Sequence, residues 1–133
     1  MNIAEYATGL QHVGIPTRAL EETVAFYTQL GFRRIYQTEN AGTSVVFLQL
    51  RDLMVEIWTG ASVGAAGAID HIAIAVTDID EVFRIISRSG VPIIEGEVRQ
   101  LPFWDHGVRY FTVAGPNAEK VEFLFVNRVV LIY

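Results

Sequence analysis

The feature that most constrains the fold is an internal repeat, because each copy of a repeat must form the same local structure. When the chain is aligned with itself so that His12 meets His71, Gly31 meets Gly90 without a gap, and apolar positions keep matching in between. Residues 55–58 (VEIW) resemble residues 121–124 (VEFL), but here the offset between the copies is larger. The chain therefore contains a duplicated module, and the second copy has a longer connection before its last strand.

Each copy is predicted to form a strand, a helix and three further strands. Thr17 can cap the first helix, and Asp78 with Glu81 three residues later forms a capping-box-like start for the second. Gly31 and Gly90 are expected to end the two helices. From alternating apolar residues and turn signals, the strands are predicted at residues 9–16, 32–39, 43–50 and 53–59, and at 69–76, 93–99, 108–114 and 119–126.

Composition excludes several classes of protein. With 133 residues, 51% hydrophobic and 19% charged, the chain is expected to be one globular domain rather than disordered. The formal charge of −5 opposes binding to nucleic acid or anionic lipid. The absence of cysteine excludes disulfides, cysteine-based zinc sites and thiol nucleophiles, and no apolar run is long enough for a membrane span. We expect a soluble, cytoplasmic protein.

Four side chains of metal-ligand type occupy matching positions in the two copies. His12 and His71 alternate with apolar residues in the first strand of each copy, and Glu56 and Glu122 do so in the last strand. Because a helix must cover the apolar face of each sheet, all four are predicted on the opposite, concave face. A carboxylate among apolar neighbours is costly to desolvate unless a cation or a proton relieves it. A divalent metal explains this arrangement economically.

Each of these residues also has an ordinary structural explanation. A single histidine in a strand is commonly structural or on the surface, and a strand glutamate is usually solvated. Repetition of the same pair at equivalent positions favours the metal site. The alternative that the sequence leaves open is half-burial of these side chains against solvent.

On these residues the chain resembles the vicinal-oxygen-chelate superfamily over nearly all of residues 9–126. The superfamily includes glyoxalase I, fosfomycin-resistance proteins, extradiol dioxygenases and bleomycin-resistance proteins. The resemblance implies an α+β fold, in which two tandem βαβββ modules form a concave metal-binding sheet. The metal ligands that it implies are His12, Glu56, His71 and Glu122. The implied domain organisation is module 1 at about residues 9–59, a linker at 60–68, module 2 at about 69–126 and a C-terminal tail at 127–133.

A His, Glu, His, Glu ligand set is similar to that of bacterial glyoxalase I and implies a metal-dependent lyase or isomerase. The implied cofactor is Zn²⁺ or Ni²⁺, with Co²⁺ or Mn²⁺ as alternatives, and it would stabilise an enediolate. Glu122 is the first candidate for the base, with Glu56 as its symmetry-related partner. Pro16 and Gly60 stand where glyoxalase I typically holds glutathione with Arg and Asn. The expected substrate is therefore a small α-hydroxycarbonyl or thiol adduct rather than specifically a glutathione adduct.

Two other functions are compatible with the resemblance. One is a metal-free, bleomycin-resistance-type protein that sequesters an apolar ligand between Trp58, Phe103 and Trp104; the other is a different metalloenzyme of the superfamily, a dioxygenase or thiol transferase. Residues 103–107 are a candidate lid in which His106 assists proton transfer, although an exposed His106 is the plainer interpretation. The apolar end of the chain, residues 129–133, favours a homodimer.

Overall fold

The computed structural model describes residues 5–6, 10–62, 64–65, 67 and 69–128. The candidate dimerisation segment at 129–133 lies outside the described residues. The chain divides into two compact units, Met1–Ser62 and Val63–Tyr133.

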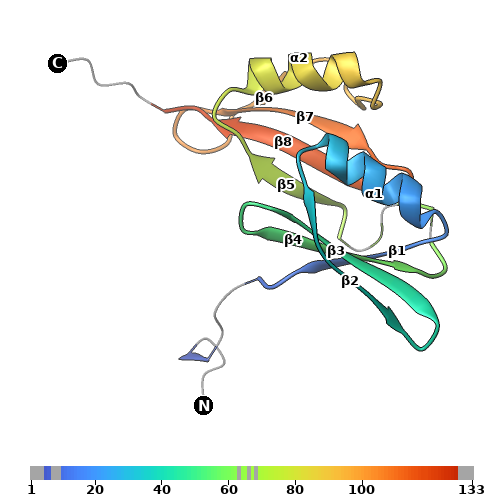
Figure 1. The fold of residues 1–133 in the computed structure, drawn as a ribbon. Coiled ribbons are helices and arrows are strands. Elements are labelled where there is room, and N and C mark those ends of the chain that lie inside the picture. The colour runs from blue at the N-terminus through green and yellow to red at the C-terminus, as the bar shows by residue number, and fades with distance from the viewer. Residues whose placement is uncertain (1–4, 7–9, 63, 66, 68, 129–133) are drawn as a thin grey trace. The chain divides into compact units, whose positions relative to one another are not determined.

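The first unit has one helix and a four-stranded sheet (Figure 1). Its elements are β1 (Val13–Thr17), α1 (Leu20–Gln29), β2 (Arg33–Asn40), β3 (Thr43–Leu50) and β4 (Leu53–Thr59). The strand order in the sheet is β1-β4-β3-β2, with β1 parallel to β4 and the other pairs antiparallel. The helix packs against β2, β3 and β4.

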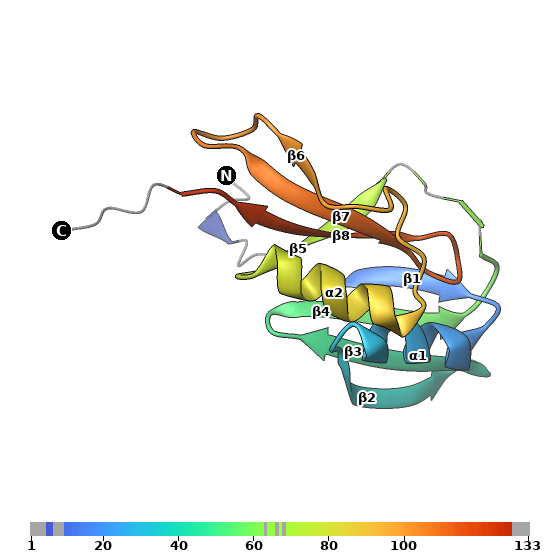
Figure 2. The ribbon, with the colours of Figure 1, turned by 90° about the horizontal axis from the view of Figure 1, so that it is seen from above.

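The second unit has the same topology (Figure 2). Its elements are β5 (His71–Ala75), α2 (Ile79–Ser89), β6 (Arg99–Leu101), β7 (Val108–Ala114) and β8 (Lys120–Val126). The strand order is β5-β8-β7-β6, and α2 packs against β7 and β8. The predicted α+β fold with two βαβββ modules is confirmed.

The strand register reproduces both offsets of the sequence repeat. Gly14 is paired with Glu56 in the first sheet, and Ala73 is paired with Glu122 in the second. The longer connection of the second copy is located mainly between β6 and β7. The turn between β2 and β3 consists of residues 41–42, whereas the β6–β7 connection runs over residues 102–107.

The sequence-based boundaries are wrong at the first and second strands of the second module and at the start of β1. Residues 10–12 precede β1, and the strand predicted at 93–99 is replaced by β6. The chain bends away from β7 after residue 94. There the carboxylate of Glu95, rather than a backbone carbonyl, accepts the N–H of Thr112 at 2.6 Å. A side chain thus takes the place of one strand-ladder bond, which no periodicity in the sequence reveals.

The two helices begin differently. The Asp78 carboxylate accepts the N–H of Glu81 at 3.1 Å and Gly90 ends α2 with a φ of +82°, as predicted. The predicted capping of α1 by Thr17 is wrong, because its N-cap is Ala19 and no side chain caps it. The Thr17 hydroxyl is buried instead, 3.0 Å from that of Thr23, and accepts the N–H of Ala19.

Each module has its own apolar core between the helix and the sheet. Val55 and Ile57 of β4 are fully buried, and Val121 and Phe123 of β8 are buried in the equivalent positions. Burial of such side chains stabilises a fold by about 1.5–3 kcal/mol each. Since side chains alternate along a strand, residues 56 and 122 must lie on the faces that the helices leave open. Among the described residues no helix is long and apolar enough to cross a membrane.

Candidate metal and substrate site

Glu122 lies in the middle of β8, on the open face of the second sheet. Its register partners are Ala73 of β5 and Thr112 of β7. The side chain of Glu122 is only 17% exposed. The predicted alternation is confirmed here, with Val121 and Phe123 buried on the helix side.

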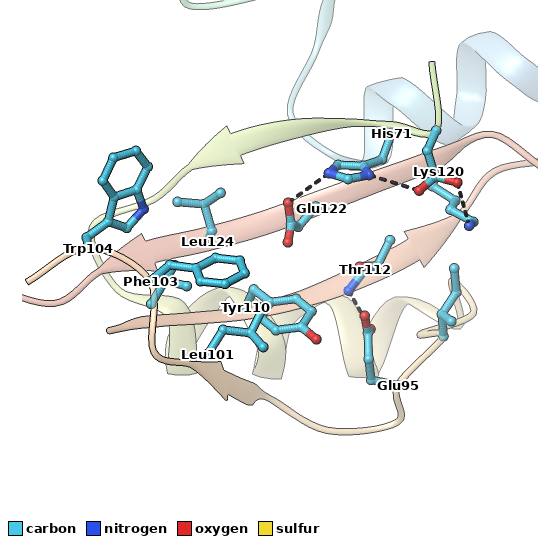
Figure 3. Close-up of a pocket in the computed structure, with 13 residues that line it drawn as sticks. His71, Glu95, Leu101, Phe103, Trp104, Tyr110, Thr112, Lys120, Glu122 and Leu124 are labelled. Carbon is cyan, nitrogen blue, oxygen red and sulfur yellow. Dashed lines mark hydrogen bonds and ion pairs between the residues drawn. The ribbon is translucent and has the colours of Figure 1, made fainter. Parts of the chain in front are cut away.

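His71 is the first residue of β5 and lies beside this carboxylate (Figure 3). Its Nε2 is 3.4 Å from Oε2 of Glu122, and its Nδ1 is 2.9 Å from Oδ2 of Asp70. Asp70 in turn accepts a hydrogen bond from Nζ of Lys120 at 3.0 Å. The four side chains form one continuous polar chain across β5 and β8.

The spacing of His71 and Glu122 fits two ligands of one divalent ion. Bonds of about 2.0–2.2 Å from zinc to nitrogen and oxygen place two ligand atoms about 2.8–3.6 Å apart at angles between octahedral and tetrahedral. The observed separation of 3.4 Å lies in this range. This pair could therefore supply one imidazole and one carboxylate ligand without rearrangement.

The surroundings of Glu122 favour its neutral form in the absence of a cation. Burial raises the pKa of this carboxyl group; the nearby His71 lowers it, and the negative charge of Glu95 raises it further. The pKa of Asp70 is shifted the other way, because hydrogen bonds from His71 and Lys120 stabilise its carboxylate. A cation bound beside Glu122 would relieve the cost of ionising it.

A cavity of about 490 Å³ opens onto these side chains (Figure 3). One end is polar and contains Glu122, His71 and Glu95, whereas the other end is apolar. The apolar lining comes from β6, β7, β8 and the β6–β7 connection: Leu101, Phe103, Trp104, Val108 and Leu124. Such a cavity can hold a small molecule with an oxygen-bearing end and an apolar end.

In the first unit, His12 and Glu56 lie on the open side of the sheet but are not in contact. The ring of His12 packs edge-on against Phe47, with centroids 6.0 Å apart, and its Nδ1 is 2.5 Å from Oε1 of Gln11. Glu56 is half-buried, between Gly14 and Phe47 in the register. Within the described part of this unit, no hydrogen bond or ion pair joins His12 to Glu56.

Comparison with known proteins identifies the family. The family model of the Glyoxalase/Bleomycin resistance protein/Dioxygenase superfamily matches residues 9–123. The chain belongs to this superfamily. It is 31% identical, over 126 residues, to the uncharacterized protein YwbC of Bacillus subtilis, and the match covers 88% of this chain and 97% of YwbC.

Solved structures of the superfamily have the same fold. A glyoxalase family protein from Enterococcus faecalis has a TM-score of 0.74 and 20% identity, with 90% of this chain and 98% of that chain covered. The fosfomycin resistance protein FosX from Listeria monocytogenes, solved in complex with Mn(II) and sulfate, has a TM-score of 0.70 and 20% identity. There the match covers 91% of this chain and 94% of FosX.

The four-ligand set expected for a superfamily metalloenzyme is still a prediction for this chain. His71 and Glu122 are neighbours within the second unit, while His12 and Glu56 belong to the first. In the residues that the structure describes, no three His, Cys, Asp or Glu side chains are grouped closely enough to hold a metal. Each unit therefore supplies at most part of the predicted site.

The β6–β7 connection contributes to the cavity through its aromatic residues. Phe103 and Trp104 line the apolar end and are 56% and 74% exposed. His106 is exposed and is not among the lining residues, in agreement with its plainer interpretation. Arg109 points away from the cavity and forms a paired hydrogen bond with Asp80 of α2, at 2.6 and 3.0 Å.

The cavity residues that were not anticipated from the sequence include Glu95, Tyr110 and Thr112. Tyr110 and Thr112 could have been found by extending the alternation of β7, since Phe111 between them is fully buried. Glu95 carries no such signal. It lies in an irregular segment outside β6, and only the bond to Thr112 places its carboxylate near Glu122.

Proposed function

We propose that this protein is a metal-dependent lyase or isomerase of the glyoxalase I-like type. The observation that carries the proposal is the placement of His71 and Glu122 3.4 Å apart, on the open face of a sheet and in the wall of a cavity. Together with their repeat equivalents, His12 and Glu56, they provide two imidazole and two carboxylate ligands. This set suits Zn²⁺ or Ni²⁺, with Co²⁺ or Mn²⁺ as alternatives.

The bound ion would supply Lewis-acid stabilisation of negative charge on a substrate oxygen. Glu122 is the proposed base, which takes a proton from the carbon next to a carbonyl and returns it to the neighbouring carbon. Burial and the adjacent charge of Glu95 raise the pKa of Glu122, which brings its proton affinity closer to that needed at neutral pH. Glu56 is the candidate for the same task on the first module.

The proposed substrate is a small α-hydroxycarbonyl compound or a thiol adduct. Adjacent oxygens would reach the polar end of the cavity, and the substituent would lie against its apolar end. At residue 16 a proline offers neither a charge nor an N–H, so a glutathione-binding arginine is missing there. We propose that the protein binds the substrate through its apolar substituent rather than through a peptide group such as glutathione. A homodimer is the proposed assembly.

Metal content of protein purified without chelators tests this function. Wild-type protein should contain about one transition-metal equivalent per chain. A double variant, His71→Ala with Glu122→Gln, should contain almost none. Glu97→Gln, a strongly exposed carboxylate on the same unit, is the matched control and should retain the metal. Equal, near-zero metal content in all three proteins would reject the proposal that this protein is a metal-dependent enzyme.

Solvent-proton exchange tests the reaction itself. Hydroxyacetone and 2-hydroxyacetophenone share the α-hydroxycarbonyl group and differ only in a methyl or phenyl substituent. In D₂O, deuterium should enter the carbinol carbon only with metal-loaded protein, and Glu122→Gln should slow entry by about 10²–10⁴-fold. Exchange at the wild-type rate in this variant would remove Glu122 as the base.

A metal-free binding protein is the second candidate, and the exposed aromatic residues favour it. Phe103 and Trp104 line the cavity but are more than half exposed, as expected of a surface that a ligand covers. In this case apolar compounds should bind to chelator-treated protein as tightly as to metal-loaded protein. A metal requirement for binding would reject this candidate.

A further inference from the structure

Both candidate ligand histidines are held by the residue that precedes them in the chain. Oε1 of Gln11 lies 2.5 Å from Nδ1 of His12, and Oδ2 of Asp70 lies 2.9 Å from Nδ1 of His71. The two acceptors are separated along the chain by the same offset as the two histidines. The contact therefore occurs at equivalent positions of the two modules.

These contacts determine which ring nitrogen carries the proton. An amide oxygen and an ionised carboxylate can only accept hydrogen bonds, so Nδ1 of each histidine must donate. In a neutral imidazole, Nε2 then carries the lone pair. In the second unit Nε2 of His71 lies 3.4 Å from Oε2 of Glu122, so a cation bound between these two atoms would meet this lone pair.

Each acceptor is itself held by a residue of the last strand of its module. Nε2 of Gln11 donates to Sδ of Met54 at 3.8 Å, and Nζ of Lys120 donates to Asp70 at 3.0 Å. Lys120 is the register partner of His71. Met54 is at the equivalent position of β4, because it directly precedes Val55, the register partner of Val13. The support is thus equivalent in position, although one pair is neutral and the other is charged.

We propose that Gln11 and Asp70 are positioning residues, each of which fixes the tautomer and ring direction of its own histidine so that the Nε2 atom of that histidine is available to bind a divalent ion. The inference rests on the proposed function, since it assigns these residues to the same metal site. A partner on the outer ring nitrogen of a metal-binding histidine orients the ring and makes the other nitrogen more basic. Asp70 is anionic and Gln11 is neutral, so His71 should be the stronger ligand of the two.

Nitrogen NMR of the metal-free protein tests the positioning without any activity. The chain has three histidines, and long-range ¹H–¹⁵N spectra of ¹⁵N-histidine-labelled protein distinguish protonated from unprotonated ring nitrogens. At about pH 8.5, above the ordinary imidazole pKa of about 6.5, His12 and His71 should each show protonated Nδ1 only. Gln11→Ala and Asp70→Ala should each convert their own histidine to a mixture of tautomers.

His106 provides the internal control. It also follows an aspartate, Asp105, but in the described residues no hydrogen bond joins these two side chains. Asp105→Ala should leave all three histidine spectra unchanged. Mixed tautomers at residues 12 and 71 in the wild-type protein, or unchanged spectra in the two alanine variants, would overturn the inference whether or not the protein binds metal.

Zn²⁺ affinity, measured in competition with a chromophoric chelator, tests the consequence for the site. Asp70→Ala should weaken binding by about 10–100-fold, and Gln11→Ala should weaken it less. The double variant Asp70→Gln with Lys120→Met places the first module's pair in the second module. It should keep a single His71 tautomer and bind Zn²⁺ with an affinity between those of wild type and Asp70→Ala.

The two readouts separate the inference from the proposed function. If wild-type protein shows the expected tautomers but no Zn²⁺ binding, the metalloenzyme proposal fails and so does the assignment of these residues to a metal site. If Zn²⁺ binds and Asp70→Ala binds it equally well, the metal site stands and the positioning role is rejected. Thermal unfolding of each variant shows whether the fold is intact, and the double variant retains a long side chain at both substituted positions.

Discussion

The indole ring of Trp58 occupies the space that a side chain at residue 14 would need. A Cβ added to Gly14 would lie 3.0 Å from Cζ3 and 3.3 Å from Cη2 of Trp58. A Cβ at Gly60 would similarly lie 3.1 Å from its Nε1. The second module has the smaller Leu124 at the position equivalent to Trp58, and it has Ala73 where the first has glycine. The large indole ring therefore occurs together with glycine in the first module, and the smaller leucine occurs together with alanine in the second.

Gly14→Ala is accordingly expected to destabilise the protein by about 1–3 kcal/mol, the usual cost of forcing extra volume against packed neighbours. The backbone at this residue is ordinary, so the cost arises from the contact with the indole ring alone. Urea unfolding followed by circular dichroism measures it. An unchanged midpoint would show that the indole moves aside freely.

Trp58→Leu provides the matching test, because together with Gly14→Ala it recreates the alanine and leucine of the second module. The double variant should be less destabilised than the sum of the two single variants, with a coupling of about 0.5–3 kcal/mol. Strict additivity would mean that the contact between residues 14 and 58 is not the source of the cost.

Much of the fold could be predicted from the sequence because it is repeated. The two offsets of the repeat, one for the first strands and one for the last, imply that Gly14–Glu56 and Ala73–Glu122 are equivalent pairs, and both pairs are observed in register. Alternation then places the two glutamates on the open faces. Alternation does not predict how the side chains around each carboxylate pack. That packing decides how deeply each carboxylate is buried.

The remainder of the site depends on contacts that leave no periodic signal. Glu95 reaches the cavity because its carboxylate replaces a backbone carbonyl beside Thr112, in a segment where the strand prediction failed. The supports of the histidines, Gln11 and Asp70, are adjacent in sequence to their partners, yet adjacency alone is insufficient. Asp105 also precedes a histidine without forming a described hydrogen bond to it.

The apolar end of the cavity should bind an aromatic substituent against Trp104. The chain has two tryptophans, so Trp58→Phe leaves Trp104 as the single tryptophan reporter in the cavity. Adding 2-hydroxyacetophenone should change its emission saturably, with affinity at least fivefold above that of hydroxyacetone. The reason is burial of the phenyl group, since about 25 cal/mol is gained per Å² of apolar surface removed from water.

Phe103→Ala should weaken this binding about fivefold, because one wall of the apolar end is lost. Tyr36→Ala is the matched control, since Tyr36 is an aromatic residue of the first unit with a similar exposure of 58%. Equal affinity for the phenyl and methyl compounds, or an equal loss in both variants, would place the aromatic contact elsewhere.

Glu95 should have separable effects on stability and on Glu122. Glu95→Ala leaves the N–H of Thr112 without its acceptor at a nearly buried position, which costs about 1–3 kcal/mol of unfolding free energy. Glu95→Gln keeps an amide oxygen as acceptor but removes a negative charge that raises the pKa of Glu122. The glutamine variant should therefore be nearly as stable as wild type, with a lower Glu122 pKa.

Chemical denaturation and ¹³C NMR titration of the glutamate carboxyl groups measure these two effects. Glu97→Gln removes a nearby exposed carboxylate and should change neither quantity. An unaltered Glu122 titration in Glu95→Gln would mean that burial alone raises its pKa.

Glu122 should also make the metal-free protein less stable as pH rises. Its pKa in the folded state is raised above the ordinary value of 4.5, chiefly by burial, so folding favours the protonated form. Below the unfolded pKa both states are protonated and no penalty exists. Between the unfolded and folded pKa values the unfolded state loses its proton first, and the penalty grows until both states are ionised.

Glutamine mimics the protonated form at every pH. Relative to wild type, Glu122→Gln should therefore gain unfolding free energy as pH rises above the ordinary glutamate pKa and reach a plateau above the raised pKa of the folded state, as urea titrations in a chelating buffer would show. Saturating Zn²⁺ should reverse the order, because only wild type gains the full free energy of binding; a constant difference across pH without metal would show that the carboxylate is not penalised by folding.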